Sequence, residues 1–164
     1  MNKVKHSLFL FLILMVIWLL LTSWNLQEFI AGFIVSALIT LFTWKLEPVL
    51  GEFQLTPQSI IHSLMFSFVF LKELIISNMD VARRVLSPTL PINPGFVVVQ
   101  TKLQSNIGKL MLANSITLTP GTLTTEVKGQ NLYIHWIDIT EDHIDGATKE
   151  IVSKFEKHLE VIFG

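Results

Sequence analysis

Two long runs without a charged side chain open the sequence and restrict its fold more than any other feature. Residues 7–24 and 29–44 contain no Asp, Glu, Lys or Arg. As a helix, the first run is about 27 Å long, close to the hydrocarbon thickness of a bilayer. Lipid offers no partner to backbone N–H and C=O groups, so such segments cross it as helices. The sequence predicts a transmembrane helical hairpin, with helices at residues 7–24 and 28–44 and a loop that completes the segment 1–56.

Composition supports a membrane protein and excludes several function classes. Hydrophobic residues make up 51% and charged residues 15% of the 164 residues, and the mean hydropathy is +0.56. A net charge of -1 provides no basic field for a nucleic acid. The absence of cysteine excludes disulfides, thiolate metal sites, iron–sulfur clusters and cysteine nucleophiles. A cleaved signal peptide would explain the basic start, but a second apolar run follows almost at once.

Small residues recur every four positions on the second apolar segment, at Gly32, Ser36 and Thr40. Small side chains on one face let another helix approach closely, because helices in lipid associate through packing. The same spacing also occurs in ordinary membrane helices. Both interpretations stay open, and we take these three residues as candidates for a helix or subunit contact.

A third helix is predicted at residues 57–86, with Thr56 as its N-cap and Pro57 at its first position. Its polar side chains fall on one stripe at helical spacing: Ser59, Ser63, Ser67, Glu73, Ser77, Asp80 and Arg84. Such a helix suits the membrane interface or a contact with other subunits. Asp80 and Arg84 have the spacing of an i,i+4 ion pair.

The topology depends on whether this third helix crosses the membrane. Two crossings plus a surface or half-inserted helix keep Lys3, Lys5, Lys45, Arg83 and Arg84 on the cytoplasmic side. Three crossings with the amino terminus outside would place only Arg83 and Arg84 on the cytoplasmic side. We favour the first arrangement, which makes the C-terminal part cytoplasmic.

A proline-rich linker at residues 87–95 separates this helix from a small α+β module at residues 96–164. Residues 96–99 indicate a buried strand and residues 106–114 a short helix. Residues 115–119 alternate hydroxyl and branched apolar side chains, which favours a strand that ends at a Pro120-Gly121 turn. Strands at 122–127 and 132–137 flank a hairpin turn, and an amphipathic helix at 146–163 closes the module. The expected order is β-α-β-β-α, with the sheet on one side and helices on the other.

Side chains that might carry chemistry have simpler explanations. A polar cluster near the end of the module suggests a metal site or an acid–base pair, but it lacks metal-ligand spacing and fits a solvated strand end: His135, Asp138, Glu141, Asp142, His143 and Asp145. The hydroxyl-rich stretch lacks a nucleophile elbow. We expect no catalytic residue, no metal and no cofactor. Lys72 and Glu73, about 100° apart on a helix, suit anchoring or subunit contact better than an ion path.

Two blocks of sequence resemble the E subunit of Mrp-type multisubunit sodium/proton antiporters. One runs from Ala113 to Leu123 and the other from Leu132 to Asp138. The likeness extends to Phe70–Leu74, to Asn78–Leu86 and to the apolar start. The resemblance implies an accessory subunit of a membrane complex that exchanges sodium for protons, in which larger subunits carry the ions. It brings no catalytic residues.

The resemblance implies partners that are other integral membrane subunits and the lipid bilayer, and a location in the cell membrane. The candidate contact or docking residues are Gly32, Ser36, Thr40, Lys72, Glu73, Arg83, Arg84, Thr117, Thr119, Pro120, Gly121 and Thr122. The alternative is a membrane-anchored adaptor whose module binds a ligand or protein and has no transport role.

Overall fold

The computed structural model describes residues 3–43, 52, 54, 56–141 and 143–164. The chain divides into two compact units, residues 1–53 and 54–164. The long third helix therefore belongs with the C-terminal module. The loop predicted after residue 44 lies almost entirely outside the described residues.

The first unit is a pair of helices, α1 (Lys3–Leu21) and α2 (Leu26–Thr43). The face with Gly32 and Ser36 is buried against α1: a Cβ at Gly32 would lie 2.5 Å from Trp18 Cδ1. Phe11 and Phe33 pack edge to face, with ring centroids 5.3 Å apart. The small residues therefore allow close approach, and the helix that approaches is α1 of the same chain.

Membrane-spanning potential is not confined to this hairpin. By length and hydropathy, α2 and the third helix, α3 (Pro57–Leu86), are candidate spans, whereas Ser7–Leu21 of α1 is a shorter apolar helix. The N-terminus of α3 is as predicted: Pro57 occupies the first turn and Thr56 Oγ1 accepts from Ser59 N at 3.1 Å.

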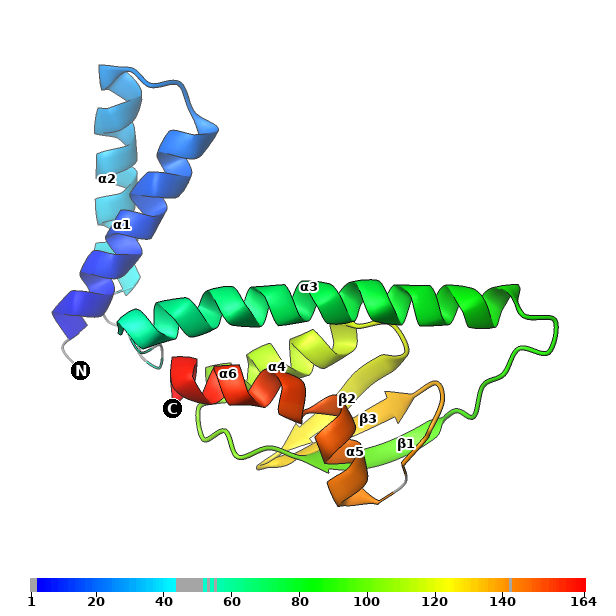
Figure 1. Cartoon of the computed structure of the whole chain (residues 1–164). Helices are drawn as coiled ribbons and strands as arrows, with labels where there is room; N and C mark the ends of the chain where they lie inside the picture. Colours follow the sequence, from blue (N-terminus) through cyan, green and yellow to red (C-terminus); the bar gives the residue numbers. More distant parts are fainter. Residues whose placement is uncertain (1–2, 44–51, 53, 55, 142) are drawn as a thin grey trace. The chain divides into compact units, whose positions relative to one another are not determined.

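The module contains a three-stranded antiparallel sheet in the order β1-β3-β2, formed by β1 (Gly95–Gln100), β3 (Asn131–Trp136) and β2 (Thr122–Lys128). Gly129 takes a φ of 62° in the predicted hairpin turn between β2 and β3. The helices α4 (Asn106–Leu118) and α6 (Ser153–Phe163) lie between the sheet and α3, and α5 (Ile144–Ile151) packs beside β1 (Figure 1).

The core forms where one face of the sheet meets the helices. Alternate residues of β1 and β3 are buried, as a half-covered strand requires. The helices add apolar side chains at helical spacing. The fully or nearly buried residues include Val97, Val99, Leu132, Ile134, Leu112, Ile116, Phe155 and Leu159. The prediction of a sheet with helices on one side is confirmed.

Two predicted elements were wrong in detail. Residues 115–118 are not a strand but the last turn of α4, which extends beyond the expected 106–114. Ile116 is fully buried while Leu118 is 60% exposed, so these residues follow helical and not alternating geometry. The closing helix is two helices, because Phe155 N bonds Val152 O in a tighter, three-residue turn between α5 and α6.

Candidate functional site

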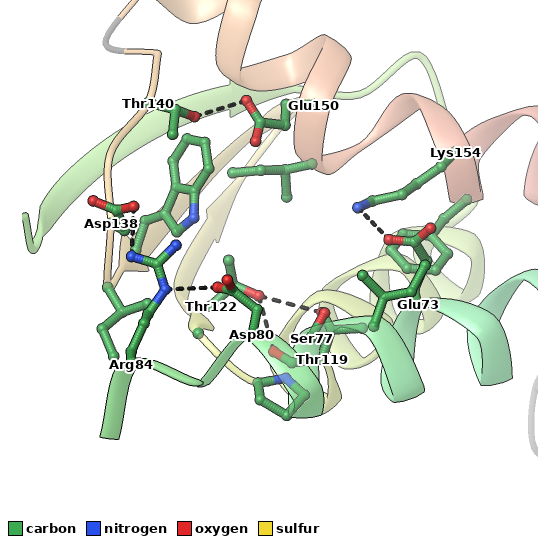
Figure 2. Close-up of a pocket in the computed structure, with 17 residues that line it drawn as sticks. Glu73, Ser77, Asp80, Arg84, Thr119, Thr122, Asp138, Thr140, Glu150 and Lys154 are labelled. Carbon is green, nitrogen blue, oxygen red and sulfur yellow. Dashed lines mark hydrogen bonds and ion pairs between the residues drawn. The ribbon is translucent and has the colours of Figure 1, made fainter. Parts of the chain in front are cut away.

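A pocket of about 230 Å³ lies where the second half of α3 meets the end of β3 and the turn between α4 and β2 (Figure 2). Six of the residues singled out from the sequence line it: Glu73, Arg84, Thr119, Pro120, Gly121 and Thr122. They come from segments far apart in the chain. The fold therefore brings half of the predicted candidates to one place.

Arg84 on α3 connects the helix to the sheet. Its Nε donates to Asp80 Oδ2 at 2.6 Å, which confirms the predicted i,i+4 pair, and its Nη1 donates to Asp138 Oδ2, also at 2.6 Å. The same Nη1 donates to the Pro91 carbonyl at 2.8 Å. The two carboxylate bonds raise the pKa of Arg84, with Asp80 as the first contributor, so the guanidinium stays charged.

A second ion pair lies on the other side of the pocket. Lys154 of α6 approaches Glu73 of α3, with Nζ 2.7 Å from Oε2. Glu150 accepts a bond from Thr140 at 2.9 Å. Among the described lining residues, four are acidic and two are basic, so the pocket carries an excess of negative charge: Glu73, Asp80, Asp138 and Glu150 against Arg84 and Lys154.

The hydroxyl-rich stretch closes the corner between α4 and β2. The last carbonyls of a helix lack intrahelical partners. Thr119 Oγ1 and Thr122 Oγ1 both donate to Ile116 O at 2.7 Å, and Thr124 Oγ1 donates to Ala113 O at 3.2 Å. In return, Thr117 Oγ1 accepts from Thr124 N at 3.1 Å. The threonines are thus helix-end partners, which explains why the stretch is rich in hydroxyls and free of charge.

Gly121 is required at this corner for two reasons. Its φ is 97°, in a region that other residues rarely adopt. A Cβ there would lie 3.1 Å from Ile137 Cγ2 and 3.9 Å from Val81 Cγ2 of α3. Its carbonyl accepts from Ile137 N at 2.8 Å. The turn therefore lies close to both the sheet and α3.

The contact between α3 and the module continues toward the start of the helix. Ser59 Oγ donates to Val161 O at 3.1 Å, and His62 Nδ1 lies 3.3 Å from His158 Nδ1. Burial lowers the pKa of His158, and the charge of Lys157 adds to the effect. The neutral form of His158 therefore suits this interface.

The other candidates lie elsewhere. Lys72 and Arg83 are exposed and do not line the pocket, and Thr117 is exposed on α4. Gly32, Ser36 and Thr40 belong to the first unit, where Thr40 Oγ1 bonds Ser36 O at 2.8 Å. Sequence reasoning missed Asp138 and Lys154 as partners of α3, because nothing local marks pairs separated by 54 and 81 positions.

Chemically, the pocket offers charge and hydrogen bonds. Glu73 and Asp138 are already engaged in ion pairs, and the signature hydroxyls are bonded to backbone. In the part of the chain that the structure describes, no three His, Cys, Asp or Glu side chains are placed to hold a metal ion. Asp142, part of the polar cluster weighed above, lies outside that part.

An exposed apolar helix pair joined to a small α+β module is typical of a membrane-associated protein. The model of the Na+/H+ ion antiporter subunit family MNHE matches residues 11–162. The chain belongs to this family, which confirms the resemblance drawn from its motifs.

Named relatives match almost end to end. The Na(+)/H(+) antiporter E subunit of Alkalihalophilus pseudofirmus is 38% identical over 149 residues, covering 89% of this chain and 90% of the relative. The E1 subunit of the Staphylococcus epidermidis antiporter is 36% identical with the same coverage. A chain in the structure of the membrane-bound sulfane sulfur reductase, an archaeal respiratory membrane complex, is 45% identical, with a TM-score of 0.84 over 96% of this chain and 99% of that one.

Replacing Arg84 by Met should loosen α3 from the module. Bonds between charged groups contribute about 1.5–3 kcal/mol, and partial exposure puts the expected loss at the lower end of that range. The change in the free energy of unfolding is measured by titrating the full-length protein with urea and monitoring unfolding by limited proteolysis. Arg83→Met is the matched control, since Arg83 is exposed one position away. Equal effects of the two variants would contradict the assigned role of Arg84.

Replacing Gly121 by Ala should cost more stability than replacing Gly129 by Ala. Both glycines have positive φ, but only Gly121 has neighbours within 4 Å of the added Cβ. We expect a loss of about 2–3 kcal/mol at Gly121 and about 1 kcal/mol at Gly129. The same proteolysis assay compares the two variants, and a larger loss at Gly129 would refute this account of the corner.

Proposed function

We propose that this chain is an accessory, non-catalytic subunit of a multisubunit sodium/proton antiporter. In this role it supports the assembly or stability of the complex and so sodium and pH homeostasis. The observation that carries the proposal is the family match over residues 11–162, which includes both units. The named relatives are themselves antiporter subunits.

An accessory role fits the placement of the charged residues. Ion paths through membranes use ionisable side chains inside the bilayer. The acidic residue of α2 is Glu28, in its first turn. Lys72 is exposed, and Glu73 is paired with Lys154 of the module. These positions support a subunit that holds its neighbours and does not itself carry ions.

Eight of the candidate residues fall into two groups. Glu73, Arg84 and the turn from Thr119 to Thr122 hold the module against α3, and so act on assembly through the shape of the subunit. Thr40 lines an apolar groove between α1 and α2 that is open to a neighbouring helix. Thr117 is exposed for contact with other subunits.

A respiratory membrane complex is a second possible host. The chain is 45% identical to a chain in the structure of the membrane-bound sulfane sulfur reductase, a higher identity than to the named antiporter subunits described above. In such a host this subunit would have the same accessory role, beside subunits that carry out redox chemistry.

Gentle detergent extraction of the tagged chain from its native membrane should recover a large assembly. Mass spectrometry of the co-purified subunits separates the two hosts: antiporter subunits alone support the first, and additional redox subunits support the second. Arg84→Met should lower the yield of the assembly several-fold, and the control Lys149→Met, at an exposed position of α5, should not. A lone 18.6 kDa protein would instead support the membrane-anchored adaptor.

For topology, we propose that α1 and α2 cross the membrane and that the module is cytoplasmic. This arrangement places Lys3, Lys5 and Lys45 on the cytoplasmic side. A cysteine introduced at Gln130, in the exposed hairpin turn, should react with an impermeant reagent only after the cells are opened. A cysteine at Asn25, between α1 and α2, should react in intact cells. The reverse pattern would overturn the orientation.

A further inference from the structure

The side of α3 that faces away from the module is a continuous apolar surface. Its large side chains are each more than half exposed: Leu64, Phe68, Leu71, Ile75, Met79 and Leu86. Their positions fall within one strip along the helix. Soluble proteins rarely expose a continuous apolar strip of this kind, so the strip has a partner outside the unit of residues 54–164.

The opposite side of α3 is attached to the module along almost its whole length. Ser59 bonds Val161, Glu73 pairs with Lys154, and Arg84 pairs with Asp138. Phe66 also packs against Phe155, with ring centroids 6.2 Å apart. From Ser59 to Arg84 the helix is about 37 Å long. Much of its polar stripe is therefore used within the chain, and the module lies along one side of the helix (Figure 1).

This attachment argues against a membrane crossing by α3. The attached length exceeds the hydrocarbon thickness of about 30 Å, so a crossing helix would draw the module into lipid. The module carries exposed charged side chains on α5 and α6, such as Lys149, Lys157 and Glu160. Burying charges of this kind in hydrocarbon is costly. Only an orientation parallel to the membrane puts the strip in lipid and the module in water.

The edges of the strip favour a lipid surface over a protein partner. Lys72 and Arg83 are exposed and fall on the same edge at helical spacing, where long cationic side chains can reach lipid phosphates. On the other edge, Ser67 Oγ bonds Ser63 O and Asn78 Nδ2 bonds Leu74 O within the helix. The strip therefore presents apolar groups and positive charge. In the chain, α3 follows the apolar hairpin of α1 and α2.

We infer that α3 lies flat in the membrane surface, with its apolar strip at the boundary of the acyl chains and with Lys72 and Arg83 at anionic headgroups. The inference rests on the proposed membrane location of α1 and α2, and it is independent of the transport role. The module is then held just beneath the headgroups by the polar side of α3.

Spin labels on the cysteine-free full-length chain test this orientation. Single cysteines replace Phe68, Ile75 and Met79 on the strip, Ile34 on α2, and Gln130 in the hairpin turn. The labelled protein is reconstituted in vesicles of phosphatidylcholine and phosphatidylglycerol, and relaxation by oxygen and by a water-soluble nickel complex is measured. We expect the three strip labels at a common depth of about 5–10 Å, the Ile34 label deeper, and the Gln130 label in water.

Other label depths would contradict either the orientation of α3 or the membrane location of α2. A depth that changes steadily from residue 68 to residue 79 would show a crossing helix and overturn the inference. Strip labels exposed to the nickel complex would also overturn it, and would leave a protein partner as the occupant. An Ile34 label in water would contradict the proposed membrane location of α2 instead, so the two failures are distinguishable.

A charge variant tests the headgroup contact separately. In the labelled chain without charge substitutions, replacing phosphatidylglycerol by neutral lipid should make the strip labels shallower. The double variant Lys72→Gln, Arg83→Gln should remove this lipid dependence. The control Lys149→Gln, Lys157→Gln makes the same change of charge at exposed positions of α5 and α6 and should keep the lipid dependence. Equal behaviour of the two double variants would contradict a role for Lys72 and Arg83.

Discussion

The ion pair between Arg84 and Asp138 joins the long helix to the sheet, and much of the second unit depends on it. Without a cationic partner, Asp138 would keep a carboxylate that is only 26% exposed, and Asp80 would lose its i,i+4 neighbour. With the bond formed, the polar stripe of α3 faces inward. The apolar side of this amphipathic helix then faces away from the module. In a soluble protein the apolar side of such a helix usually faces the core instead.

The two units are stabilised by different interactions. In α1 and α2, backbone groups are bonded within each helix, and side-chain packing of the kind seen at Gly32 and Trp18 joins the pair. In the module, an apolar core of strands and helices supplies the driving force. Helix α3 belongs to the module by its contacts and resembles the hairpin by its hydropathy. Its length and hydropathy make it a candidate span, and its contacts make it part of the module.

Local chemistry predicted much of the fold. Thr56 and Pro57 begin α3 as expected, and the glycine turn joins β2 to β3. Residues 115–118 were misassigned because alternation of hydroxyl and apolar side chains suits both a strand and a helix end; the burial of Ile116 decides between them. The pairs Arg84–Asp138 and Glu73–Lys154 follow from tertiary packing, which no local pattern reports. Motif resemblance identified the family but could not show which of its residues meet.

The corner between α4 and β2 is held by neutral groups, whereas the attachment of α3 to the module includes two ion pairs. Hydroxyl–carbonyl bonds such as those of Thr119 and Thr122 neither titrate nor weaken through ionic screening. Ion pairs such as Lys154–Glu73, partly open to water, are screened as salt rises. A rise in salt would therefore leave the internal shape of the module unchanged while softening its attachment to α3. The contacts at the corner between α4 and β2 therefore tolerate salt, whereas the ion pairs that attach α3 are sensitive to it.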